Sequence, residues 1–171
     1  MRWRLLPHGV LVAAALLAAA PASAQSADPL VPLQFLVGEW RAIDTPAGER
    51  GSFTFKFDVQ RHVLVRTNEA VYDATAAHPA SRHDDLMVVY AENGSVKADY
   101  FDSEGHVIRY VAHVDPKRVT FVSDLDPKGP RYRLSYTLAS DGTLNGTFEI
   151  ATPDAPETFK PYLAWKARRQ P

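Results

Sequence analysis

The chain has 171 residues, 19 lysines and arginines against 20 aspartates and glutamates, and no cysteine. The charge balance argues against nucleic acid or an anionic membrane as a partner, because both need a clustered basic surface. The missing thiols exclude disulfides, cysteine nucleophiles and zinc sites built on thiolates.

The first 24 residues have the pattern of a secretory signal peptide. Arg2 and Arg4 precede an apolar run over residues 10–20, and Ala22-Ser23-Ala24 is typical of a cleavage site. The run is too short for a membrane span. We therefore expect an exported protein, periplasmic or secreted, whose mature part covers residues 25–171 as one domain without a membrane span.

Strands and turns dominate the rest of the chain after a short helix opened by Asp28-Pro29. Tight hairpins are predicted at Asn93-Gly94 and Asp141-Gly142, and Phe53, Phe55 and Phe57 alternate as in a half-buried strand. About ten strands are predicted, over residues 38–43, 52–57, 62–72, 86–91, 96–101, 106–113, 118–123, 131–138, 144–151 and 162–168. Consecutive hairpins without long helices predict an all-β, up-and-down antiparallel barrel and exclude a parallel sheet.

One long irregular segment is predicted at residues 73–85. It contains His78, His83, Asp84 and Asp85, whose nitrogen and oxygen atoms could ligate a divalent metal. The irregular spacing favours a solvated polar loop instead, so no metal site is predicted. Loops of this length in compact domains are often lids or binding loops.

The two ends of the predicted barrel domain are rich in tryptophan and arginine. The first strand opens with Gly38-Glu39-Trp40, and the last ends with Arg168-Arg169. We expect Trp40 to plug one end of the barrel and a terminal arginine to cover its ring, since a guanidinium is attracted to an indole face. The alternative is a core tryptophan with two solvated arginines.

These features resemble the lipocalin and calycin group, which shares a Gly-x-Trp first strand and a basic last strand. Four segments resemble a bacterial lipocalin-like family of exported proteins without an assigned function: LQFLVGEW (33–40), HDDLMVVY (83–90), YFDSEGHVIRY (100–110) and FKPYLAWKARR (159–169). The resemblance implies a lipocalin-like barrel with room for one small ligand.

The chain is also distantly similar to nitrobindins, small haem-binding barrels with a comparable first strand. Their haem-ligating histidine lies near the C-terminus in a Pro-His-Leu setting, which here is Pro161-Tyr162-Leu163. A phenol must lose its proton before it ligates ferric iron, whereas a neutral imidazole is ready at pH 7. We therefore predict no cofactor, and do not expect haem as the native ligand.

Candidate ligand-binding residues cluster around one predicted hairpin. Tyr100, His106 and Tyr110 would form an aromatic wall with one titratable imidazole. Arg66 and Arg133 are candidates for an interior cation that holds a ligand carboxylate; the alternative places both on the outer face. Tyr162 is the sixth candidate ligand-binding residue.

The segment Asp102-Ser103-Glu104-Gly105, just before His106, allows an acid–base interpretation because a carboxylate can tune a neighbouring imidazole. Its composition favours a hairpin turn in which Asp102 bonds its own backbone and Gly105 takes a positive φ. No G-x-S-x-G, P-loop or H-E-x-x-H motif is present.

The sequence therefore favours an exported protein that binds a small hydrophobic or amphiphilic molecule, with an acidic end if an arginine lies inside. No catalytic residue is assigned. The alternatives are a haem protein or small-molecule enzyme using His106 or Tyr162, and a structural or interaction module with a filled barrel. The sequence does not define the oligomeric state.

Overall fold

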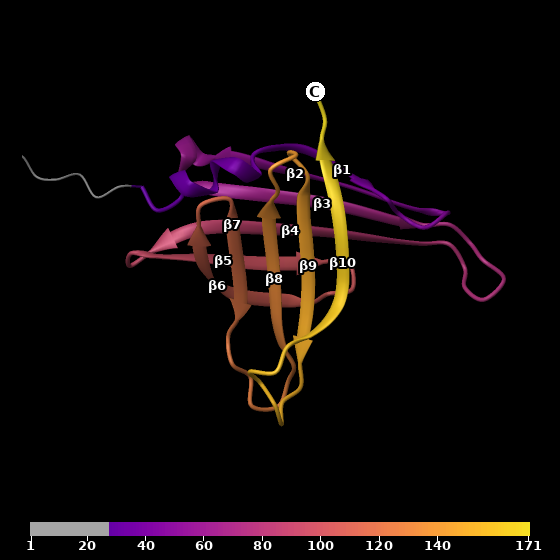
Figure 1. Cartoon of the computed structure of the whole chain (residues 1–171). Helices are drawn as coiled ribbons and strands as arrows, with labels where there is room; N and C mark the ends of the chain where they lie inside the picture. The colour runs from indigo at the N-terminus through magenta and orange to yellow at the C-terminus, as the bar shows by residue number, and fades with distance from the viewer. Residues whose placement is uncertain (1–27) are drawn as a thin grey trace, which may run out of the picture.

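The computed structural model describes residues 28–171 as a closed barrel of ten antiparallel strands (Figure 1), which confirms the predicted fold class. The expected signal peptide, residues 1–24, lies outside the described residues. The strands are β1 (Gly38–Ile43), β2 (Glu49–Asp58), β3 (Val63–Tyr72), β4 (Ser81–Glu92), β5 (Ser95–Asp102), β6 (Val107–Asp115), β7 (Arg118–Ser123), β8 (Arg131–Leu138), β9 (Leu144–Ala151) and β10 (Lys160–Arg169), with short 3-10 helices η1 (Val31–Leu36) and η2 (Val59–Arg61).

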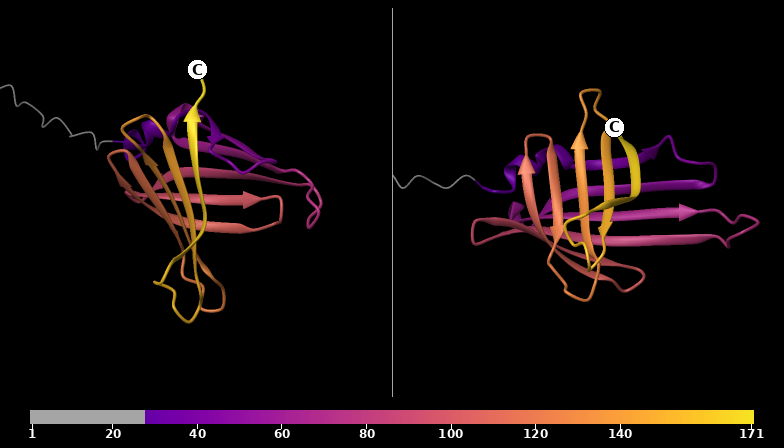
Figure 2. Two further views of the ribbon diagram at one scale, coloured as in Figure 1. Left: turned by 45° about the vertical axis from the view of Figure 1, so that its right-hand side comes forward. Right: turned by 60° about the horizontal axis from the view of Figure 1, so that its bottom comes forward.

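Each strand pairs with its neighbours in the sequence, and β1 closes the barrel by pairing with β10, where Trp40 lies opposite Arg169. Strands β2 to β5 run across the view in Figure 1 and β7 to β10 run from top to bottom, so two layers cross steeply. The turned views in Figure 2 show the same crossing. Within residues 28–171, no helix is long and apolar enough to cross a membrane.

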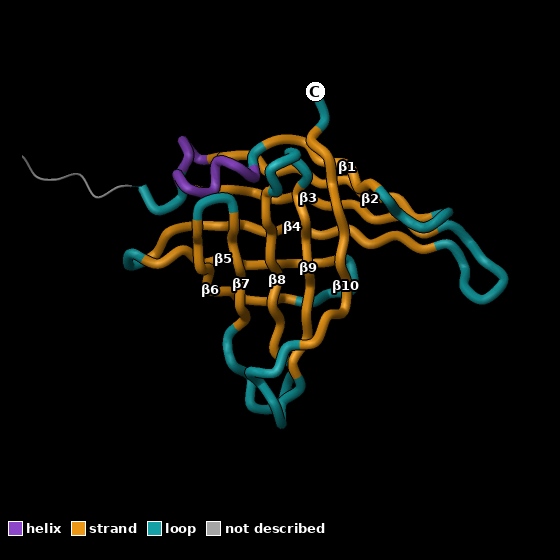
Figure 3. The backbone as a smooth tube through the Cα atoms, viewed as in Figure 1, coloured by secondary structure: helices purple, strands orange, loops and turns teal. Residues whose placement is uncertain are grey.

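Up-and-down connectivity gives the barrel two different ends. The turns at residues 59–62, 93–94, 116–117 and 139–143 share one end. The loops at residues 44–48, 73–80, 103–106, 124–130 and 152–159 share the other. Figure 3 shows the loop at residues 73–80 projecting to the right, away from η1. We call these the closed end and the open end.

The predicted irregular segment 73–85 is shorter than expected, and this part of the prediction is wrong. Strand β4 begins at Ser81 and pairs in continuous register with β3, placing Asp85 opposite Asn68. The segment is polar because its inward-facing Asp85 binds Arg66 and Asn68 inside the barrel. Its polarity therefore does not indicate a loop exposed to solvent.

The closed end is sealed by apolar contacts and by Trp40. Leu30, Leu33 and Leu36 of η1 and its preceding turn are completely buried with the Trp40 ring. The indole Nε1 donates a hydrogen bond to the Leu36 carbonyl at 2.7 Å. The polar atom of the buried indole therefore has a hydrogen-bond partner.

Arg169 is the terminal arginine that covers the plug. Its guanidinium carbon lies 4.6 Å from the Trp40 ring centroid, and the guanidinium donates to the carbonyls of Phe35, at 2.8 Å, and Val37. Gly38 has a φ of 135°, and a Cβ there would lie 3.1 Å from Arg169 Nη1. A glycine is needed at Gly38 for both reasons. Arg168 instead is exposed and lies opposite Arg41.

Aromatic side chains continue the core from the plug into the barrel. The Trp40 ring stacks on Phe53 at 6.3 Å, and Tyr136 meets Phe55 at 5.4 Å and Trp165 at 5.9 Å, edge to face. Trp165 lies directly over Gly146, where a Cβ would come within 2.1 Å of the indole. The core is therefore packed near the closed end and ends at Trp165.

Candidate ligand-binding site

A large cavity opens beyond this aromatic core. It has a volume of about 1070 Å³ and is lined both by inward-facing strand residues and by residues of the open-end loops, such as Pro46 and Glu104. On strand β3 the lining residues Arg66, Asn68 and Ala70 alternate in sequence, as expected for one face of a strand. The barrel interior is therefore hollow toward its open end, which argues against the filled-barrel alternative.

One wall of the cavity is apolar and aromatic. Ile108, Tyr110, Leu134 and Trp165 line it, together with Tyr132 stacked on Phe148 at a centroid distance of 5.7 Å. Burial, and next the neighbouring Tyr136 oxygen, raises the pKa of Tyr110 far above its usual value. This phenol is therefore neutral at physiological pH, and the wall offers an uncharged surface to a ligand.

The opposite wall is built on a buried ion pair between Arg66 and Asp85. The Arg66 guanidinium donates to Asp85 Oδ1, and the Asn68 amide donates to Asp85 Oδ2 at 2.9 Å. Burial alone would lower the pKa of Arg66, but the Tyr136 and Asp85 oxygens outweigh it and hold that pKa above its usual value. Arg66 is only 5% exposed and fully charged, and Asp85 compensates that charge.

His83 extends this polar wall toward the open end. Its Nδ1 lies 2.8 Å from Glu104 Oε2, and its Nε2 lies 3.2 Å from Tyr100 Oη and 3.4 Å from Asp85 Oδ2. Burial, and next the Asp85 charge, raises the pKa of Tyr100 far above its usual value. A neutral Tyr100 can therefore donate its proton to the His83 ring or to a ligand.

Asp102 forms the hairpin turn that the sequence favours. Its carboxylate accepts hydrogen bonds from the backbone N–H groups of Glu104, at 3.1 Å, and His106, at 2.9 Å, while Gly105 has a φ of 88°. The His106 Nδ1 lies 2.9 Å from the other oxygen. Burial raises the pKa of Asp102, but the hydrogen bonds from His106 outweigh it and hold that pKa below its usual value.

Five of the six predicted ligand-binding residues line one cavity. Arg66, Tyr100 and Tyr110 lie inside it, and His106 and Tyr162 lie at its rim. The Tyr162 side chain is 65% exposed, and among residues 28–171 the one aromatic ring that it contacts is Phe148, edge to face.

Arg133 does not line the cavity. It alternates with the inward-facing Leu134 on β8, donates to both Glu149 oxygens at 2.6 and 2.7 Å, and lies 4.4 Å from the Phe159 ring centroid. Of the two alternatives for Arg133, the outer face is the one that the structure has, because strand alternation turns this side chain away from the cavity.

The sequence interpretation missed the residues that complete the polar wall, namely Asn68, His83, Asp85 and Glu104. The available signal was that His83, Asp85 and Met87 occupy every second position of β4 and so share one face. Asp85 lies opposite the polar Asn68 of the neighbouring strand. Such a pairing of polar positions across two strands predicts a polar interior.

No protein-family model matches this chain, and no curated protein sequence matches it either. What the molecule itself shows is the closed, ten-stranded antiparallel barrel, which is consistent with a lipocalin or calycin-like fold.

Proposed function

We propose that this barrel binds one small, mainly apolar molecule through its open end, as an exported, periplasmic or secreted protein. The observation that carries the proposal is the cavity of about 1070 Å³ with an aromatic wall and a few converging polar groups. Ligand pockets in proteins have this composition and a volume of ~300–1000 Å³. Export is supported only by the sequence pattern of residues 1–24.

The polar end of the ligand is neutral or cationic in this proposal. Arg66 is already paired with Asp85, and the two acidic groups at the rim, Asp102 and Glu104, have only histidines as ion-pair partners among residues 28–171. A ligand carboxylate would meet these charges without a free cation to bind it. This replaces the acidic end expected from the sequence.

Haem is not part of the proposal. Tyr162, which occupies the position of the nitrobindin histidine in the sequence resemblance, lies at the exposed rim. Its phenol would have to ionise before it could ligate iron. We also assign no catalysis to the cavity.

Competition between ligands of equal chain length tests the proposal. Nile red, a neutral apolar dye, is bound first and then displaced by dodecanol, dodecylamine or dodecanoate. In metal-free buffer, we expect the alcohol and the amine to displace the dye at lower concentrations than the carboxylate. Burial of the shared alkyl chain stabilises all three complexes by ~25 cal/mol per Å², so the difference reports the polar end.

A matched pair of variants locates the binding. Ala70 lines the cavity and Val71 is its neighbour on the other face of β3. Ala70→Trp should reduce Nile red binding by filling the cavity, and Val71→Trp should leave it unchanged. Equal Nile red binding in both variants would place the dye outside the barrel, and no binding to the unmodified chain would overturn the proposal.

A further inference from the structure

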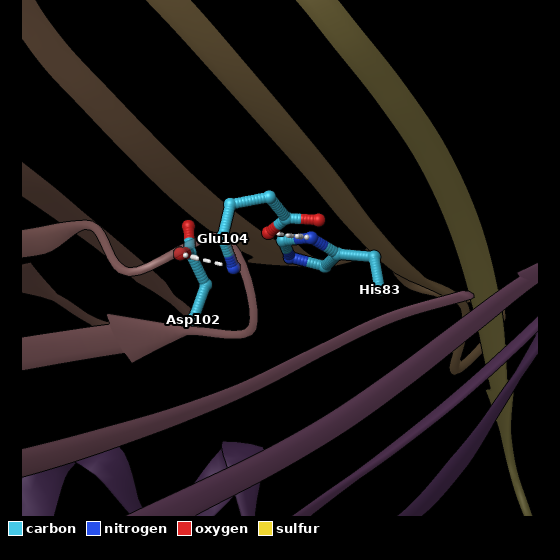
Figure 4. Close-up of side chains that lie close together, drawn as sticks. All are labelled: His83, Asp102 and Glu104. Atoms are coloured by element: carbon cyan, nitrogen blue, oxygen red, sulfur yellow. Dashed lines mark hydrogen bonds and ion pairs between the residues drawn. The ribbon is translucent and has the colours of Figure 1, made fainter. Parts of the chain in front are cut away.

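We propose that the open end also holds a divalent transition-metal ion, ligated by His83, Asp102 and Glu104. One ligand atom from each of these side chains lies within 4.8 Å of the other two. Figure 4 shows the imidazole of His83 and the two carboxyl groups lying close together. They come from β4, the end of β5 and the turn that follows it. This site is separate from the apolar wall, and the proposal does not depend on the organic ligand.

The donor atoms suit first-row divalent ions. Imidazole nitrogen binds zinc, iron and nickel, whereas carboxylate oxygen also binds manganese. A set of one nitrogen and two oxygens therefore favours ions such as Zn²⁺, Co²⁺ or Mn²⁺. Bonds of ~2.0–2.2 Å require the three groups to approach further. Glu104 can do so because its side chain is 47% exposed on a turn and already lies 2.8 Å from His83 Nδ1.

A second, independent feature is the buried group behind His83. Histidines that ligate metals nearly always donate the other ring N–H to a carboxylate or carbonyl, which fixes the ring. His83 Nε2 lies 3.4 Å from Asp85 Oδ2, and the Asp85 side chain is only 4% exposed. Arg66 and Asn68 hold that carboxylate from the other side. With Nδ1 on the ion, Nε2 carries the ring proton and faces two oxygens, Tyr100 Oη at 3.2 Å and Asp85 Oδ2 at 3.4 Å.

The charges around the site also favour a cation. Arg66 is paired with Asp85, and Arg82 is paired with Glu69 and Asp84. Among the described residues, Asp102 and Glu104 therefore have no arginine or lysine partner. A divalent ion offsets both negative charges. Three protein ligands leave coordination positions open to water or a ligand, as in catalytic zinc sites.

The test is a titration of the chain, purified without an affinity tag, with Co²⁺ followed by visible absorption and with Zn²⁺ followed by calorimetry. We expect one ion per chain. His83→Gln and Glu104→Gln should each weaken Zn²⁺ binding by at least about tenfold, since removal even of an outer partner costs 10- to 100-fold. His113→Gln is the matched control, because His113 is an exposed histidine on β6 outside the site, and it should change nothing.

Several results would overturn the proposal: no saturable binding by the unmodified chain, equal affinity in His83→Gln and Glu104→Gln, or a loss of binding in His113→Gln. If a variant does not fold, the ¹⁵N spectrum of the histidine rings in the unmodified chain decides. Zn²⁺ should move the Nδ1 signal of His83 most, and an unmoved His83 signal contradicts the site. Nile red binding in the same samples reports the apolar cavity separately.

Discussion

The closed and open ends of the barrel use similar residues in opposite ways. At the closed end, Arg169 covers the Trp40 ring and donates to the backbone carbonyls of Phe35 and Val37, so its guanidinium has partners at the end of η1. At the open end, the Trp165 ring faces a cavity, and Glu104 and His106 point to its rim. Both ends carry aromatic and charged side chains, but only the open end leaves space beside them.

This difference separates stability from binding. Close packing makes the closed end sensitive to the loss of any large side chain, whereas substitutions at an exposed rim usually change stability by less than ~0.5 kcal/mol. The free energies of unfolding of variants at the two ends test that separation.

The largest loss is expected at the plug. Trp40→Ala removes a buried aromatic ring with its hydrogen bond to Leu36 and should lower the unfolding free energy by ~3–5 kcal/mol. Urea unfolding measures this. A midpoint within error of the unmodified chain would show that Trp40 does not seal the barrel. Tyr162→Ala, at the rim, is the control and should change the midpoint little.

A similar loss is expected between the two ends, where Arg66 meets Asp85. Arg66→Met leaves a buried carboxylate without its cation and should cost ~3–5 kcal/mol. The double variant Arg66→Met with Asp85→Leu should be more stable than this single variant, because it removes both charges. A double variant that loses at least as much as the single one would contradict the buried ion pair.

Comparison of the two terminal arginines gives a smaller effect. Arg169→Ala should lower the unfolding free energy by ~1–2 kcal/mol through the lost contact with the Trp40 ring. Arg168→Ala should stay within ~0.5 kcal/mol, since its side chain is exposed. Equal losses in the two variants would mean that the ring contact contributes nothing.

The smallest effect at neutral pH is expected for Tyr136→Phe. The Tyr136 hydroxyl is buried without a hydrogen-bond partner among the described residues, so its removal should cost little. Burial is the main cause that raises the pKa of Tyr136 to about 12; Arg66 lowers this pKa and Asp85 raises it.

The pH dependence of this variant follows from that shift. The unfolded phenol ionises near pH ~10, so the contribution of Tyr136 is complete below pH 10 and is lost as pH rises to about 12. As the pH rises from ~10 to about 12, the unfolding free energy of Tyr136→Phe should therefore fall less than that of the unmodified chain. Parallel alkaline curves for the two proteins would contradict the shift.

Much of the fold could be predicted because the turns carry local signals. The strands at residues 38–43, 118–123, 131–138 and 144–151 match the predicted bounds, and Asn93-Gly94 joins β4 to β5. The start of β4 could not be found in the same way. His83 and Asp85 lack the apolar alternation of a half-buried strand. The inner face is polar here, because Asp85 binds Arg66 and Asn68 inside the barrel.

The site was harder to predict than the fold because it depends on which face of a strand a side chain occupies. Strand alternation places Leu134 and Tyr136 on one face of β8, and this already turns Arg133 outward. Arg66 shares its strand face with Leu64 and Asn68. This mixture of apolar and polar residues is compatible with either the interior or the outer surface of the barrel. Only its burial and its ion pair with Asp85 on β4 show that Arg66 lies inside.

The central claim is that a ligand enters the open end and leaves the closed end untouched. Two single-tryptophan chains test it, both with Trp3→Phe: Trp165→Phe keeps Trp40 in the plug, and Trp40→Phe keeps Trp165 in the cavity wall. On addition of dodecanol, the emission of Trp165 should change saturably and that of Trp40 should stay constant. A response from Trp40 alone, or from neither indole, would contradict the claim.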